Sequence, residues 1–171
     1  MFKKLLIACT CIGALFSSVS VVAQGNIGVI NLEGVLIGSN YSRQQYQALQ
    51  ADAQYKKLLS DIKSLKSELQ ALQKEGEANA LTWSDDQKKS HIQKGQIKLE
   101  QYKRLGAQEA QTRNGLASQI EKELGPTIEK IVNNVIEEKK IGLLLKSQAV
   151  YFRTVEFDIT EEVVKRLNDS Q

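Results

Sequence analysis

Residues 55–72, with the sequence YKKLLSDIKSLKSELQAL, decide the fold of this 171-residue chain. Their apolar side chains recur in steps of three and four, at Tyr55, Leu58, Ile62, Leu65, Leu69 and Leu72. This spacing puts them on one stripe of a helix and is typical of a coiled-coil seam. A helix over residues 41–75 would be roughly 50 Å long, more than the diameter of a small domain. The sequence therefore predicts a helical arm that projects from a body.

A second helix, over residues 85–124, is predicted to fold back along the first, so that residues 41–124 form an antiparallel hairpin. Ser84 and Gln87 fit a capping box at its start. Ser39, Asn40 and Ser42 are all plausible N-caps of the outgoing helix, and Ser42 fits a capping box with Gln45. Gly76 is predicted to end the outgoing helix. The inward candidates of the return helix are Ile92, Leu99, Tyr102, Gly106, Ala110, Ala117, Ile120 and Leu124.

Three glycines interrupt the return helix, and each costs up to about 1 kcal/mol relative to alanine. The favoured interpretation is a hinge in the arm at Gly95 and Gly106. The alternative is a close approach of the two helices, which glycine also permits.

The first 23 residues are predicted to be an export signal that is cleaved after Ala23. Lys3 and Lys4 precede an apolar run over residues 5–16 that is too short for a stable membrane anchor. The alternative is a buried or membrane-anchoring N-terminal helix. Both cysteines, Cys9 and Cys11, lie in this segment, so the mature chain would hold neither a disulfide nor a thiolate metal site.

The charge of the mature chain is expected to be nearly balanced, because 21 of the 23 basic residues and all 20 acidic residues follow the signal. Its basic residues gather in one band of the return helix: Lys88, Lys89, Lys94, Lys98, Lys103 and Arg104. This band has two interpretations of equal weight. It could bind anionic lipid headgroups, nucleic acid or anionic client segments, or it could be an ordinary solvated face.

The body is predicted to be split, with residues 24–40 before the arm and residues 125–171 after it. A strand over 27–32 precedes a short helical stub at 35–37, and two antiparallel strands follow at 143–145 and 149–152. Pro126 is placed in the first turn of a new helix, and Thr160 is expected to cap the last one. The expected core is Ile27, Val29, Ile30, Leu143, Leu145, Val150, Phe152, Val163 and Leu167.

Three short strands are too few for a stable open sheet with exposed edges, and pairing strands between chains would remove those edges. The predicted fold class is α+β and mostly α, in an oligomer.

No enzyme chemistry, metal or cofactor is expected. His91 is the only histidine and lies on the arm, which offers no rigid pocket for a catalytic triad. Asp85 and Asp86 are adjacent on a helix and point about 100° apart, so a helix cap is favoured over a metal or acid–base pair. Trp83, at the arm tip, is either a client contact or packed against its own hairpin turn.

Two segments resemble the Skp/OmpH family of periplasmic chaperones for outer-membrane proteins. The first is IGLLLKSQAVY at residues 141–151, followed by DITEEV at 158–163, and the second is the strand IGVIN at 27–31. The order of signal, strand, helical hairpin, helix, strand pair and terminal helix also matches. The resemblance implies a homotrimer in which a small β-barrel shares strands from three chains.

The resemblance also implies that three arms enclose a cavity in the periplasm. Unfolded outer-membrane proteins would be held there without ATP and kept from aggregating before membrane insertion. Anionic lipid or lipopolysaccharide is a further candidate partner, whereas nucleic acid is not expected for an exported protein. The alternatives are an envelope coiled-coil adaptor or scaffold, and an anionic-lipid or nucleic-acid binding module.

Overall fold

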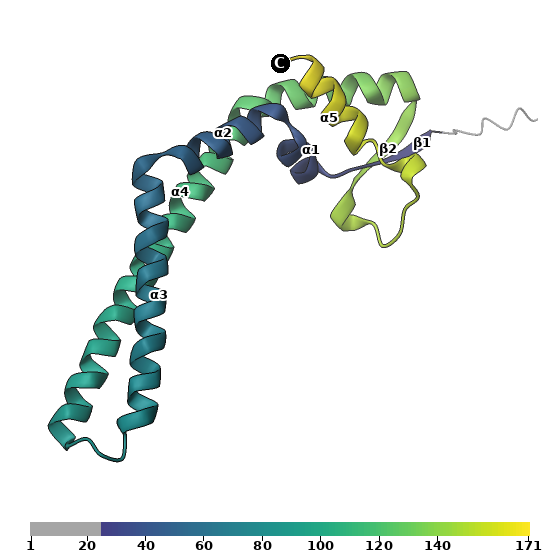
Figure 1. Cartoon of the computed structure of the whole chain (residues 1–171). Coiled ribbons are helices and arrows are strands. Elements are labelled where there is room, and N and C mark those ends of the chain that lie inside the picture. The colour runs from purple at the N-terminus through teal and green to yellow at the C-terminus, as the bar shows by residue number, and fades with distance from the viewer. Residues whose placement is uncertain (1–24) are drawn as a thin grey trace, which may run out of the picture.

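A computed structural model describes residues 25–171, and the predicted export signal lies outside them. This part of the chain is mostly helical with one two-stranded sheet (Figure 1). Its helices and strands are β1 (Asn26–Ile30), α1 (Leu32–Gly38), α2 (Asn40–Ala51), α3 (Ala53–Asn79), α4 (Asp85–Lys139), β2 (Ile141–Lys146) and α5 (Thr160–Asp169). Two short 3-10 turns, η1 (Ser147–Ala149) and η2 (Val155–Phe157), lie between β2 and α5.

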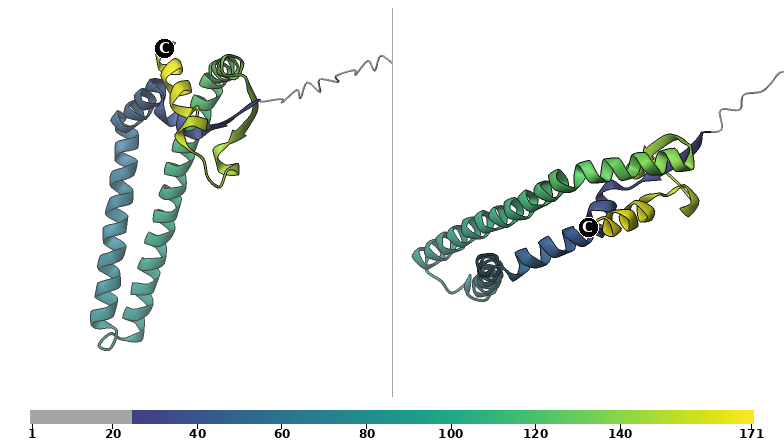
Figure 2. Two further views of the ribbon diagram at one scale, coloured as in Figure 1. Left: turned by 90° about the vertical axis from the view of Figure 1, so that its right-hand side faces the viewer. Right: turned by 90° about the horizontal axis from the view of Figure 1, so that it is seen from above.

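The arm consists of α3 and the first half of α4, which run side by side away from the body (Figures 1 and 2). The prediction of one outgoing helix over 41–75 is wrong, because the chain breaks at Asp52. The backbone of Asp52 is extended at ψ 132°, and its side chain accepts a hydrogen bond of 2.8 Å from the Tyr55 N–H. Asp52 thus caps a new helix, which continues through Gly76 to Asn79.

Helix α4 is one helix of 55 residues that belongs to both the arm and the body. The predicted break at Gly125–Pro126 is therefore wrong. A proline inside a helix removes a backbone hydrogen bond and costs about 3 kcal/mol. The apolar face nevertheless continues across it without a change of period, and tertiary packing of that face outweighs the local cost. The buried residues of this face are Ile120, Leu124, Ile128, Ile131 and Val135.

The capping box of Ser84 and Gln87 is confirmed, with reciprocal hydrogen bonds of 2.8 and 3.3 Å. The predicted box of Ser42 and Gln45 is wrong. Of the three candidate N-caps, Ser39 caps α2: its hydroxyl accepts a hydrogen bond from the N–H of Ser42, which is itself buried. Ser39 takes the cap position because the short helix α1 ends at Gly38, directly before it.

The last helix is also capped differently from the prediction. Asp158 accepts a hydrogen bond of 2.9 Å from the N–H of Thr160. The hydroxyl oxygen of Thr160 instead accepts a hydrogen bond of 2.9 Å from the N–H of Asn31, at the end of β1. The hydrogen bond between Asn31 and Thr160 joins the part of the body before the arm to the part after it.

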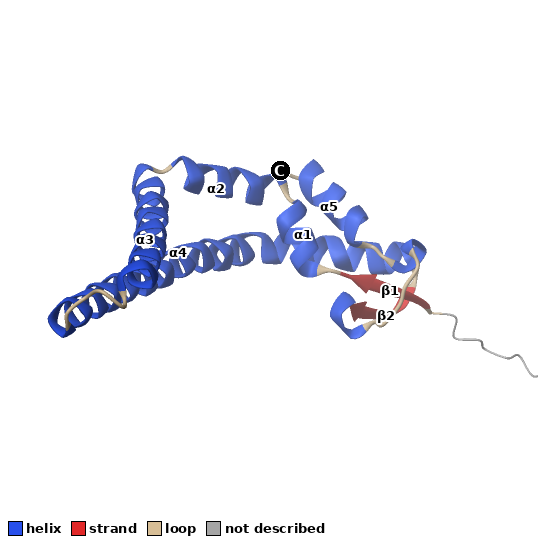
Figure 3. Ribbon diagram, turned by 60° about the horizontal axis from the view of Figure 1, so that its bottom comes forward, coloured by secondary structure: helices blue, strands red, loops and turns tan. Residues whose placement is uncertain are grey.

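The sheet pairs β1 with β2 in parallel, and Val29 is opposite Leu145 (Figure 3). A parallel pair needs a long crossover, and the whole arm serves as that crossover. The predicted antiparallel strand at 149–152 is wrong for the described residues: the chain turns at η1 and finds no neighbouring strand there. Among the described residues, the outer edge of β2 therefore stays unpaired, and the outer edge of β1 is met only at Val29, whose carbonyl accepts a hydrogen bond of 2.9 Å from the N–H of Ile159.

The core lies where α1, α4 and α5 meet the end of β1. Val163 and Leu167 of α5 are fully buried, and Val29 and Ile30 are nearly so. The other residues expected in the core are less enclosed. Ile27, Leu143 and Phe152 are exposed, and Leu145 and Val150 are half-buried, and the strand expected at 149–152 does not form beside them.

Candidate functional site

The apolar seam of α3 faces α4. Of its six residues, Tyr55 is buried and Leu58, Ile62, Leu65, Leu69 and Leu72 are half-buried. The five aliphatic residues stay partly exposed because α4 is the only helix that covers the seam. The arm is therefore a thin pair of helices with little core of its own.

The facing seam of α4 is more polar than that of α3, with four charged or imidazole side chains among its seven residues. Its half-buried residues recur in the same steps of three and four, at Lys88, His91, Gly95, Lys98, Tyr102, Leu105 and Glu109. Polar pairs link the two helices: Tyr55 donates a hydrogen bond of 2.8 Å to Glu109, Lys98 bonds Glu68, and His91 lies 3.8 Å from a carboxylate oxygen of Glu75.

The inward positions predicted for α4 are partly wrong. Ile92 is 59% exposed and Leu99 is 41% exposed, so both lie beside the seam rather than in it. The hydrophobic pattern misled the prediction because polar side chains with partners on α3 occupy the true seam. The arm consequently carries exposed apolar side chains along its flank, and sequence reasoning did not identify them as such.

The basic residues of the band do not converge on one surface. Successive helical residues turn by about 100°, so these six side chains point in directions that span the circumference of α4. Lys98 and Lys103 are engaged by Glu68 and Glu100. Lys89, Lys94 and Arg104 are exposed on different sides of the helix. This dispersion favours a solvated helix surface over a single anion-binding patch.

Trp83, at the arm tip, packs against its own hairpin. Its ring centroid lies 4.5 Å from that of His91, at an interplanar angle of 50°. His91 in turn fills the space beside Gly76, where an added Cβ would lie only 3.1 Å from its Nε2 atom. In contrast, a Cβ at Gly95 or Gly106 would meet nothing within 4 Å. Those two glycines therefore do not mark a close approach of the helices.

The body carries an exposed apolar loop between β2 and α5. Tyr151, Phe152 and Val155 are almost completely exposed. Arg153 holds the base of this loop by bonding one carboxylate oxygen of Asp158 at 2.8 and 2.7 Å. Sequence reasoning placed part of the loop in a strand, and its only signal was the high apolar content of YFRTVEF at residues 151–157.

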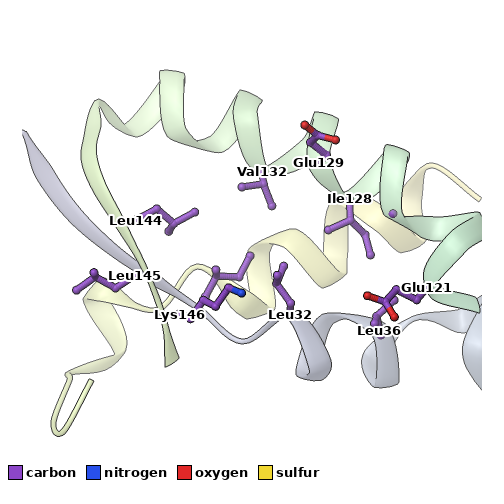
Figure 4. A pocket seen from close by; sticks show the side chains of 11 residues that line it. Leu32, Leu36, Glu121, Ile128, Glu129, Val132, Leu144, Leu145 and Lys146 are labelled. Atoms are coloured by element: carbon purple, nitrogen blue, oxygen red, sulfur yellow. The ribbon is translucent and has the colours of Figure 1, made fainter. Parts of the chain in front are cut away.

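An apolar groove of about 370 Å³ lies beside this loop, between α1, α4 and β2 (Figure 4). Its apolar walls are Leu32, Leu36, Ile128, Val132, Leu144 and Leu145. Such a groove, together with an exposed aromatic loop, is typical of a surface that another polypeptide covers. The sequence did not reveal it because residues more than 100 positions apart form its walls.

Ion pairs set the charge states at the body. Partial burial opposes ionisation of Asp158, but hydrogen bonds from Thr160 and Arg153 outweigh it and lower its pKa. Hydrogen bonds from Arg166 lower the pKa of Glu138, and those from Lys139 contribute most to the lowered pKa of Glu162. The ion pairs of Arg166 with Glu138 and of Lys139 with Glu162 hold α5 on the end of α4.

Residues 25–171 were compared with the patterns of metal sites and of membrane-spanning helices. They contain no group of three or more histidine, cysteine, aspartate or glutamate side chains arranged to hold a metal ion. Over the same residues, none of the helices has the length and apolarity needed to cross a membrane.

A small mixed body with a long helical arm is the fold class that the structure defines. The family model described as outer membrane protein (OmpH-like) matches residues 26–167. A Skp-like protein of Pseudomonas aeruginosa is 25% identical over 159 residues, which cover 91% of each chain. The crystal structure of an OmpH-like protein from Caulobacter crescentus is 17% identical, covers 86% of both chains and superposes with a TM-score of 0.45. The chain belongs to the OmpH-like family, as the resemblance in its C-terminal segment indicated.

Proposed function

We propose that this protein is an ATP-independent periplasmic holdase for unfolded outer-membrane proteins. Membership of the OmpH-like family supports this proposal. The structural observation that carries it is the arm, a long thin helical pair with exposed apolar side chains such as Ile92 and Leu99. Its role would be to bind an unfolded chain before membrane insertion and so prevent its aggregation.

The assembly proposed for this activity is a homotrimer. Residues 24–40 and 125–171 would form its body, and residues 41–124 would be the arm of each chain. The exposed loop around Phe152 contributes no residue to the lining of the apolar groove at Leu144, so the two could meet as different surfaces of neighbouring chains. A contact between two different surfaces is heterologous and forms a closed ring when its rotation closes. Three copies would then pair their open strand edges in a small shared barrel.

The binding mechanism needs no chemical energy. Many weak apolar contacts can hold a disordered chain without selecting one bound geometry. Preferential binding of the unfolded client shifts its equilibrium away from aggregation by mass action. The arms of three chains would supply these contacts around a common cavity, and bending near Gly95 and Gly106 would adapt the cavity to clients of different size.

Light scattering tests this function. A urea-denatured outer-membrane barrel protein is diluted into buffer with and without residues 24–171 of this chain. We expect scattering to fall as the chaperone concentration rises, without ATP. Unchanged scattering at a several-fold excess of the chaperone would reject the holdase and favour an adaptor or scaffold that binds one folded partner.

A further inference from the structure

The turn at the tip of the arm has one packed side chain. This turn, over residues 80–84, joins α3 to α4 at the far end of the arm (Figure 1). Among its side chains only Trp83 is partly buried, and Leu81 is completely exposed. The Trp83 ring packs on His91, with 4.5 Å between the ring centroids. The side-chain packing of the tip therefore depends on the only tryptophan and the only histidine of the chain.

The imidazole ring of His91 lies between the two helices of the arm. It belongs to the seam of α4, and its side chain is only 19% exposed. Its Nε2 atom faces Gly76 of α3, where an added Cβ would lie 3.1 Å away, so glycine makes room for the ring. Its Nδ1 atom lies 3.8 Å from a carboxylate oxygen of Glu75. One ring from α4 thus meets both α3 and the tip turn.

Glu75 is the charged group that faces His91. Among residues 25–171, its carboxylate is the only one within 4 Å of the ring nitrogens. The tip turn itself carries no charge. The other charged residues around the ring, on α3 and on the start of α4, are Lys74, Glu77, Asp85, Asp86, Lys88 and Lys94. Three of these are acidic and three are basic, so their charges balance and the electrostatic response of His91 is set mainly by Glu75.

Protonation of His91 changes its contacts at the tip. A distance of 3.8 Å is too long for a hydrogen bond, so a neutral imidazole gains little from Glu75. An imidazolium ion is attracted to the carboxylate, and a cation within about 6 Å of a tryptophan ring is attracted to its π-system. Histidine is the side chain that ordinarily exchanges a proton between pH 5 and 8. The added charge therefore strengthens the contacts of His91 with both Glu75 and Trp83.

The carboxylates that stabilise the body do not respond in this pH range. The pKa values of Glu138 and Glu162 are lowered from 4.5 and that of Asp158 from 3.8, so these groups stay ionised between pH 5 and 8. Their contribution is lost only as the pH falls further. A stabilisation that needs protonated His91 has the opposite sign: it is present at the acidic end of the range and is lost as the pH rises.

We propose that His91 is a pH-sensitive clasp, which stabilises the tip of the arm when it is protonated. As the pH falls from 8 to 5, the imidazolium ion pairs with Glu75 of α3 and holds Trp83 of the tip turn against α4. As the pH rises, the proton passes to solvent and the tip turn loosens. The clasp needs neither a client nor a second chain, so it goes beyond the proposed holdase function and does not rest on it.

Tryptophan fluorescence tests the contact between His91 and Trp83, because the chain has no other tryptophan. A protonated imidazole quenches the fluorescence of an indole ring that it touches. We expect the fluorescence of residues 24–171 to fall as the pH is lowered from 8 to 5, and His91→Gln to lose this change. Circular dichroism verifies that the variant keeps its helices. Constant fluorescence in the wild-type protein, or the same change in folded His91→Gln, would overturn the proposal.

Amide hydrogen exchange over residues 76–92 tests the stabilisation of the tip. Protection factors, which remove the intrinsic pH dependence of exchange, should be about threefold higher at pH 5.5 than at pH 7.5, as expected for one partly exposed charge pair. Glu75→Gln should bring this ratio close to one. Glu77→Gln is the matched control and should keep the wild-type ratio, because it removes a carboxylate of the same helix that bonds Gln73 instead.

Equal protection at both pH values in the wild-type protein, or equal ratios in Glu75→Gln and Glu77→Gln, would overturn the clasp and leave the holdase proposal untouched. Failure of the wild-type protein to reduce the light scattering of a client would instead reject the holdase and leave the clasp in place.

Discussion

At the scale of single residues, two tyrosines tie the outgoing chain to α4 on either side of the break at Asp52. Tyr41 donates a hydrogen bond of 2.5 Å to Glu123, and Tyr55 donates one of 2.8 Å to Glu109. Both tyrosines and both glutamates are fourteen residues apart, so the two bonds repeat along the antiparallel pair. The two hydrogen bonds fix the positions of α2 and α3 along α4.

The hydrogen bond from Tyr41 lowers the pKa of Glu123 below its ordinary value of 4.5, and it raises the pKa of Tyr41 above 10.0. A lowered folded-state pKa means that the stabilisation from Glu123 is present above the unfolded pKa. It is lost as the pH falls through the folded value. Glu68, Glu138, Asp158 and Glu162 have lowered pKa values too, so acid should destabilise both arm and body.

Tyr41→Phe tests this contact. Without the hydroxyl, the pKa of Glu123 should rise toward its ordinary value, which an NMR titration of the side-chain carboxyl measures. Tyr46→Phe is the control, because no hydrogen bond engages the Tyr46 hydroxyl among residues 25–171. An unchanged Glu123 titration in Tyr41→Phe would contradict the hydrogen bond.

Residue-scale features could be predicted where their partners are local in sequence. The capping box of Ser84 and Gln87 needs residues only three apart, and the sequence showed it. Thr160 bonds Asn31, 129 positions away, so its own local pattern suggested a cap that does not form. The polar residues of the α4 seam could not be predicted either, because their partners lie far away in sequence, on α3.

At the scale of elements, some helices and strands follow local sequence propensity, whereas others depend on tertiary packing. The outgoing seam could be predicted because leucines and an isoleucine mark it directly. The continuity of α4 could not, because glycine and proline at 125–126 are local stop signals that the packing of Ile128, Ile131 and Val135 overrides. The strand expected at 149–152 does not form, because a strand needs a neighbouring strand to bond and residues 25–171 of a single chain offer none there.

Pro126→Ala tests the continuity of α4. Alanine restores the missing backbone hydrogen bond within a helix and should raise the free energy of unfolding by about 1–3 kcal/mol. Urea denaturation measures this change. If Pro126 stood instead in the first turn of a separate helix, where its ring is favourable, the substitution would be neutral or destabilising.

Gly106→Ala tests the proposed flexing of the arm. A Cβ there meets nothing within 4 Å, so alanine should stabilise the helix by up to about 1 kcal/mol. Amide hydrogen exchange over residues 93–114 should slow accordingly. Gly76→Ala is the matched control, because its Cβ would crowd His91 at 3.1 Å and offset the gain. Uniformly slow exchange in the wild-type protein over these residues would argue against a hinge.

At the scale of the whole molecule, the body of a single chain leaves too much apolar surface exposed. Phe152 is 79% exposed, Tyr151 and Val155 still more, and the groove lined by Val132 and Leu144 lies open. The sequence predicted an oligomer from the small number of strands, and these exposed side chains are consistent with that prediction. It could not show the groove or the loop, which arise only when α1, α4 and β2 come together.

Tyr151→Ser/Phe152→Ser tests the role of the loop in assembly. Removing two exposed aromatic side chains should weaken the association of free chains, and sedimentation velocity at micromolar concentration measures the resulting mass. The helices should remain, because neither residue belongs to the core of α1, α4 and α5. An Ile97→Ser variant, altered on the arm, should keep the wild-type mass. Equal masses for all three proteins would exclude the loop from the interface.

Native mass spectrometry of residues 24–171, alone and with an outer-membrane barrel protein diluted from urea, tests the central claim most directly. The proposed holdase predicts a free species of three chains and a complex of three chains with one unfolded client. A single-chain mass at micromolar concentration would contradict the shared body. A stable trimer that forms no complex with the client would contradict the holdase.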